Sequence, residues 1–129
     1  MRVLLDTTVL IDALRGRPAA ERVRLLRKLG HVPWISPINH EEVLRGAHEN
    51  EEPVVLRFLE GIRLVALGQE EGVRAGRWRR DHARKGITLS QADCLIAAAA
   101  VAIDARLATG NPGHFPMDEL EVEHWPVGE

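Results

Sequence analysis

Short strand-like apolar runs alternate with longer helical patterns along the whole chain. Strands are expected at 3–5, 32–36, 63–67, 106–109 and 120–125, the last at a sheet edge. Helices are expected at 9–14, 19–29, 38–48, 53–62, 69–86 and 90–105. This alternation predicts an α/β domain with a central, mostly parallel sheet and helices on both faces. No repeat or linker-like stretch divides the 129 residues, so 1–129 is assigned to one domain.

Composition excludes several classes of protein. No apolar run approaches the roughly 20 residues that span a bilayer, and the amino terminus lacks a signal-peptide pattern, so no membrane association is expected. The single cysteine, Cys94, rules out an internal disulfide and suits a reducing cytoplasm. Its neighbours, ADCLIAAAA, are typical of a buried apolar position rather than a nucleophile. The six histidines lack zinc-ligand spacing, and the glycines of TGNPGHF lack the Lys-Ser/Thr of a phosphate-binding loop.

An acidic side chain, Asp6, stands where the first predicted strand ends. One interpretation is that Asp6, Thr7 or Thr8 caps the helix that follows. The other starts from the rule that sites in parallel sheets form at the carboxyl ends of strands, where the strand order reverses. Asn111 follows the strand at 106–109 at the equivalent end. The sequence therefore predicts that Asp6 and Asn111 share one edge of the sheet.

Two further carboxylates lie in apolar helical segments. Alone, Glu42 is typical of a helix surface, and Asp93 of a first-turn partner for the helix dipole. Together with Asp6 they form a set of oxygen ligands of the kind that Mg²⁺ or Mn²⁺ requires. A hard-cation site made by these three acids is the resulting hypothesis.

Four segments, in order, carry a resemblance that covers essentially the whole chain. They are LLDTTVLIDALRG, ISPINHEEVLRGA, LSQADCLIAAAA and LATGNPGHF. With these motifs the chain resembles the PIN-domain family, most closely the VapC-type toxins of bacterial toxin–antitoxin pairs. The first three motifs place the family's acids at Asp6, Glu42 and Asp93. The fourth position often carries Asp, whereas this chain has Asn111, which offers an amide oxygen without a charge.

The resemblance implies a PIN-like fold and a metal-dependent endoribonuclease that hydrolyses RNA phosphodiester bonds. It also implies a homodimer, inhibition by a cognate antitoxin, and Mg²⁺ or Mn²⁺ as cofactor. The implied catalytic residues are Asp6, Glu42, Asp93 and Asn111, of which the first three hold the metal. Thr8 would steady the Asp6 turn and Thr109 the Asn111 loop, although both threonines could equally be caps.

Arginine-rich segments are the predicted RNA-binding elements. In RAGRWRRDHARK, at 74–85, Arg79 and Arg80 would meet phosphate and Trp78 would stack on a base. The alternative is that Trp78 packs in the core and the arginines face water. Arg15 and Arg17, close to the acids by connectivity, would meet RNA phosphate or an antitoxin carboxylate.

Two other functions stay open on the sequence. One is a housekeeping RNA-processing PIN nuclease, and the other is a catalytically weak binding module that acts through its antitoxin and DNA. Among the remaining polar residues, Asn39 is the expected N-cap of the helix at 38–48. Asp12, Glu41 and Asp81 are expected at solvated helix positions.

Overall fold

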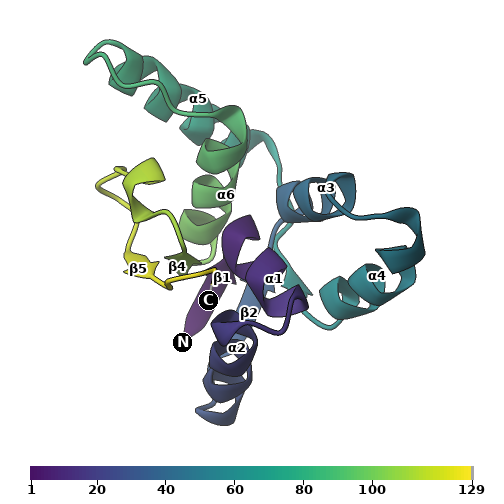
Figure 1. Cartoon of the computed structure of the whole chain (residues 1–129). Coiled ribbons are helices and arrows are strands. Elements are labelled where there is room, and N and C mark those ends of the chain that lie inside the picture. The colour runs from purple at the N-terminus through teal and green to yellow at the C-terminus, as the bar shows by residue number, and fades with distance from the viewer. Residues whose placement is uncertain (129) are drawn as a thin grey trace.

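Five parallel strands form one sheet in the order β3-β2-β1-β4-β5 in the computed structural model, which describes residues 1–128 (Figure 1). The strands are β1 Arg2–Leu5, β2 Val32–Ile35, β3 Arg63–Leu64, β4 Arg106–Thr109 and β5 Val122–His124. Both edge strands are short, which limits open pairing along the sheet. The predicted parallel α/β architecture is confirmed.

Helices cover both faces of this sheet (Figure 1). They are α1 Thr7–Leu14, α2 Pro18–Lys28, α3 Pro37–Arg45, α4 Glu52–Glu60, α5 Gln69–Ala83 and α6 Gln91–Ala102, with short 3-10 turns η1 Glu49–Glu51 and η2 Pro112–His114. Strand β1 is buried on both sides: Leu4 packs with α5 and α6, whereas Val3 and Leu5 pack with α1 to α4. Burial on both faces explains why the three residues after Arg2 in β1 are all apolar instead of alternating.

The strand order reverses between β1 and β4. From β1 the chain proceeds through β2 to β3 on one side, and then returns to place β4 and β5 on the other. Leu5 is in register with Ala108, and the Asp6 amide donates to the Ala108 carbonyl at 2.9 Å. The carboxyl ends of β1 and β4 are therefore neighbours, as the sequence predicted for Asp6 and Asn111.

Several predicted element boundaries differ from those of the structure, and two of the differences bear on the packing around the site. Strand β3 covers only two of the residues expected at 63–67, because after Val65 donates to the Ile35 carbonyl (2.8 Å) the chain leaves the sheet for α5. Helix α3 begins after Ser36, so Asn39 lies inside its first turn and is not the N-cap. Instead, the Asn39 side-chain oxygen accepts from the Ser36 amide at 2.7 Å.

Asp12, predicted to be solvated, is in fact buried, and Trp78 is buried as in the second of its two interpretations. Asp12 is 3% exposed, and its carboxylate accepts from the amides of Ala19 (3.1 Å) and Gly128 (3.0 Å). Trp78 is 6% exposed and donates to Glu119 at 2.6 Å, which excludes it as a stacking platform for an RNA base. Cys94 is buried as predicted, and burial raises the pKa of its thiol to about 11. None of the helices within residues 1–128 is both long and apolar enough to cross a lipid bilayer.

Candidate active site

Asp6 is the buried acid at the centre of the site. It occupies the N-cap position of α1, but its Oδ2 accepts from the hydroxyls of Thr109 (2.7 Å) and Thr8 (3.2 Å). Asp6 is thus the N-cap residue by position, as one interpretation predicted, but its side chain makes no capping hydrogen bond. Its side chain is instead anchored between the ends of β1 and β4.

Burial raises the pKa of Asp6 above its ordinary value of 3.8, because the ionised carboxylate loses hydration. Hydrogen bonds from Thr109, the Thr7 amide and Thr8 oppose that rise. Repulsion from the Asp93 carboxylate adds to it. The carboxylates of Asp6 and Asp93 therefore interact electrostatically, although the two residues are distant in sequence.

The two threonine hydroxyls that hold Asp6 also hold the loop after β4. Thr8 accepts from the Gly110 amide at 3.0 Å, and Thr109 accepts from the Asn111 amide at 3.0 Å. Each hydroxyl therefore accepts a hydrogen bond from a backbone amide and donates a hydrogen bond to the Asp6 carboxylate. These bonds tie the start of α1 to the β4–η2 loop.

Glu42 enters the site from α3 and is half-buried. Its Oε1 accepts from the Thr7 hydroxyl at 2.7 Å, and that hydroxyl accepts from the Asn39 amide nitrogen at 3.1 Å. Sequence reasoning missed Thr7 and Asn39 as site residues. The signal that could have found them is a second hydroxyl directly after Asp6 and an amide one helical turn before Glu42.

Asp93 enters from the first turn of α6. The Ser90 hydroxyl caps this helix by accepting from the Asp93 amide at 3.0 Å. Desolvation raises the pKa of the Asp93 carboxyl, opposed by a hydrogen bond from Ser90 and by the neighbouring His114, while repulsion from Glu42 adds to the rise. His114, which the sequence did not single out, places Nδ1 3.6 Å from Asp93 Oδ2.

The donor chemistry of the three acids fits a hard divalent cation. Glu42 is joined at 2.7 Å to Thr7, the residue after Asp6, and Asp93 interacts repulsively with both carboxylates, so the three acids lie in the same part of the fold. Within residues 1–128, however, no three side chains of the His, Cys, Asp or Glu types stand close enough together to ligate one ion directly. Mg²⁺ keeps several of its waters and takes only one or two protein carboxylates directly, so this open arrangement suits it.

Asn111 lies on the rim of this space. It is exposed, its amide is held by Thr109, and its carbonyl accepts from the His114 amide at 3.0 Å. Its backbone thus brings it close to Asp6 through Thr109 and close to Asp93 through His114. The backbone of the fourth motif position therefore lies near Asp6 and Asp93.

The arginines predicted to bind RNA lie farther out. Arg15 and Arg17 follow the end of α1 opposite to Asp6, where they line a hollow together with Thr8. Arg79 donates to the Leu89 carbonyl at 3.0 Å and so stabilises the loop between α5 and α6. Arg80 is exposed beside Asp81, at 2.9 Å. Glu41 and Asp81 are exposed, as expected.

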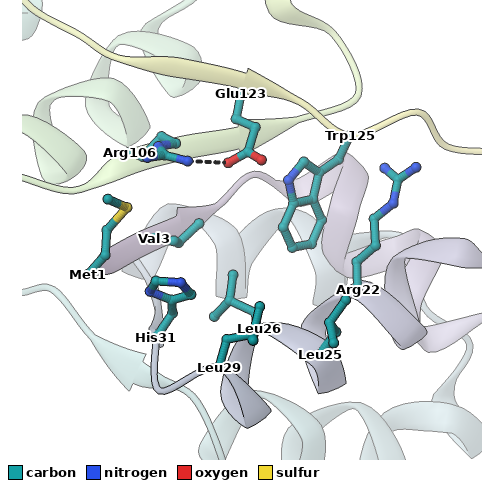
Figure 2. A pocket seen from close by; sticks show the side chains of 10 residues that line it. All are labelled: Met1, Val3, Arg22, Leu25, Leu26, Leu29, His31, Arg106, Glu123 and Trp125. Atoms are coloured by element: carbon teal, nitrogen blue, oxygen red, sulfur yellow. Dashed lines mark hydrogen bonds and ion pairs between the residues drawn. The ribbon is translucent and has the colours of Figure 1, made fainter.

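A separate apolar hollow of about 280 Å³ lies between α2 and the amino-terminal ends of β1 and β4 (Figure 2). Leu25 and Leu29 of α2 line one wall, and Arg106 donates to Glu123 at 3.0 Å on another. The side chains that line it within residues 1–128 include none of the three acids. This hollow is therefore separate from the candidate catalytic site.

Comparisons with known proteins bear on the family and the fold of this chain. The family model described as "PIN domain" matches residues 3–119. The chain is 34% identical over 117 residues to a protein named Ribonuclease VapC19 from Mycobacterium tuberculosis, covering 88% of this chain and 92% of that protein. It is 38% identical over 121 residues to Ribonuclease VapC10 from the same species, covering 91% and 88%. A solved structure of VapBC2 from Rickettsia felis, bound to a promoter DNA fragment, matches with a TM-score of 0.83 and 25% identity over 97% of this chain and 99% of that chain.

Proposed function

Since this chain belongs to the PIN-domain family, we propose that it is a metal-dependent endoribonuclease acting as the toxin of a VapBC-type toxin–antitoxin pair. The observation that carries the proposal is the convergence of Asp6, Glu42 and Asp93 from three separate segments on one sheet edge. Like charges brought together at the strand switch point are costly unless a cation joins them.

Asp6, Glu42 and Asp93 would hold Mg²⁺ or Mn²⁺, with Asn111 able to offer a neutral oxygen beside them. When bound, such an ion lowers the pKa of a coordinated water and stabilises negative charge on a scissile phosphate. The chain contributes the three carboxylates and holds the elements that carry them in position. Thr8 and Thr109 fix Asp6, while Ser90 caps the helix that carries Asp93.

RNA phosphates would approach the open rim near Asn111 and His114, both of which are exposed. Farther out, the exposed guanidinium of Arg80 and those of Arg15 and Arg17 would extend the interaction with the RNA backbone. Arg79 would add its positive charge from α5. Replacing any one phosphate-binding arginine by alanine should reduce the log–log salt slope of single-strand binding by about 0.7.

A cognate antitoxin is the proposed protein partner, and a homodimer the proposed state of the free protein. Support for the antitoxin comes from two structural neighbours: the VapBC2 structure from Rickettsia felis and a toxin–antitoxin complex from Klebsiella pneumoniae at 26% identity and a TM-score of 0.76. Light scattering of the free protein tests the dimer directly. A mass equal to one chain would contradict it.

The decisive test of activity is RNA cleavage by the purified protein in Mg²⁺, in Mn²⁺ and in EDTA, beside an Asp6→Asn variant. We expect cleavage with either ion, none in EDTA, and none with the variant. Mapping of new RNA 5′ ends after brief induction in cells identifies the cut sites. Equal cleavage by the variant would refute the assignment, and metal-dependent binding without any cleavage would favour the weak binding module.

A further inference from the structure

A one-way hydrogen-bond chain runs through the interior to Glu42. Ser36 donates to Asn39 Oδ1 from its amide (2.7 Å) and from its hydroxyl (2.9 Å). Asn39 Nδ2 donates to Thr7 Oγ1 at 3.1 Å, and Thr7 Oγ1 donates to Glu42 Oε1 at 2.7 Å. Ser36 and Asn39 are both 0% exposed, so water does not compete for the two bonds between them, whereas the bonds that Thr7 makes are partly buried.

The donors and acceptors leave this chain a single direction. Two donors from Ser36 face the oxygen end of the Asn39 amide, so its NH₂ end must face Thr7. A threonine hydroxyl carries one proton. Because Asn39 already donates to the Thr7 oxygen, the Thr7 proton is left for Glu42. The backbone amide of Ser36 thus determines, through the side chains of Asn39 and Thr7, that Glu42 is presented with a hydrogen-bond donor.

We propose that Thr7 and Asn39 are positioning residues that hold Glu42 ready for a divalent cation, an inference that rests on the proposed function. The reason is conformational entropy: a free Glu side chain loses rotamer freedom when a ligand fixes it. Here Thr7 fixes Oε1 before any ion arrives. A carboxylate accepts at both oxygens, so the bond from Thr7 leaves acceptor capacity on Glu42 for a ligand.

Adjacent threonines therefore serve different acids. Thr7 donates to Glu42 on α3, whereas Thr8 donates to Asp6 at the end of β1. The first turn of α1 thus fixes the distance between two acids that belong to different elements. Groups that hydrogen-bond to metal-binding side chains typically change metal affinity 10- to 100-fold when they are removed.

The test is calorimetric titration of Mn²⁺ into the full-length free protein, without RNA. Thr7→Val removes the hydroxyl while preserving the branched shape, and we expect Mn²⁺ affinity to fall about 10-fold or more. Thr7→Ser restores the hydroxyl and should bind within about threefold of wild type on the same reasoning. The exposed Thr88, changed in the same two ways, is the matched control and should leave affinity unaltered.

Asn39→Ala tests whether the effect passes through Thr7. Alone it should weaken Mn²⁺ binding, but on the Thr7→Val background it should add nothing, because the hydroxyl that it directs is gone. Additive losses would show that Asn39 acts by another route and would overturn the chain as described. If Asn39→Ala does not fold, as melting curves would show, the Thr7 valine and serine pair still decides the proposal.

Glu42→Gln, titrated in parallel, separates this inference from the proposed function. If Glu42→Gln loses affinity while Thr7→Val equals wild type, the positioning role is refuted and the proposed function stands. If Glu42→Gln also equals wild type, Glu42 is not a ligand and both fail. Equal losses for Thr7→Val and Thr7→Ser would overturn the positioning role as well, because the hydroxyl would then be irrelevant.

Discussion

Replacing the buried Asp12 by alanine should destabilise the fold by about 3–6 kcal/mol, from two charge-assisted hydrogen bonds at roughly 1.5–3 kcal/mol each. Helix α2 starts after Arg17, a side chain with no acceptor atom, so its first turn lacks a conventional cap. Asp12 supplies the acceptor: Oδ2 binds the amide of Ala19, and Oδ1 binds the amide of Gly128 in the carboxyl-terminal tail. Alanine would leave both donors unpaired.

Asparagine at this position separates the two bonds. Its single oxygen can keep the hydrogen bond from Ala19, but its NH₂ group would then face the Gly128 amide, donor against donor. Asp12→Asn should therefore cost about half as much as Asp12→Ala. On a chain shortened to end at Pro126, which lacks the Gly128 donor, the asparagine substitution should cost clearly less than in the full-length protein.

The assay is urea unfolding at pH 7 and fixed protein concentration, with melting curves alongside. For a chain of this size a loss of about 3 kcal/mol lowers Tm by roughly 10 °C. Glu41→Ala is the control, because Glu41 is exposed and pairs only with the exposed Arg45 at 2.8 Å, and it should change stability little. An Asp12→Ala protein within about 1 kcal/mol of wild type would refute the capping role assigned to Asp12.

Three other perturbations follow from the site. Burial raises the pKa of Asp6, so the metal-free fold loses stability as pH rises from 3.8 through the raised pKa and the buried carboxyl ionises. Asp6→Asn should remove that loss, and the variant should melt at or above the wild-type Tm at pH 7. A lower Tm would contradict the prediction. Asn111→Asp should tighten Mn²⁺ binding to the free protein and lower the metal-free Tm slightly; calorimetry and melting that match wild type would place residue 111 outside the pocket. A Cβ on Gly110 would stand 2.8 Å from Val127 Cγ2 and 3.3 Å from Thr8 Oγ1, so Gly110→Ala should lower Tm. Adding Val127→Ala should recover part of the loss. If nothing is recovered, the clash with Val127 is not the cause.

Much of the acid pattern was predictable because it follows from local rules. An acid directly after a buried strand lies at the carboxyl end of the sheet, and a parallel α/β order brings such ends together. Asp6 and Asn111 followed from that argument. Glu42 and Asp93 were individually ambiguous, and only their membership of four ordered motifs set them apart from ordinary helix-surface acids.

The sequence by itself determined the element order, the parallel sheet and the acidic edge, since apolar periodicity and strand-end position are properties of neighbouring residues. The tertiary structure alone decided which polar side chains are buried and what they bind. Thr109 reaches Asp6 across 103 positions and Gly128 reaches Asp12 across 116. Nothing local distinguishes a solvated Asp12 from one that caps a later helix, because the donor it meets is brought there only by the packing of distant elements.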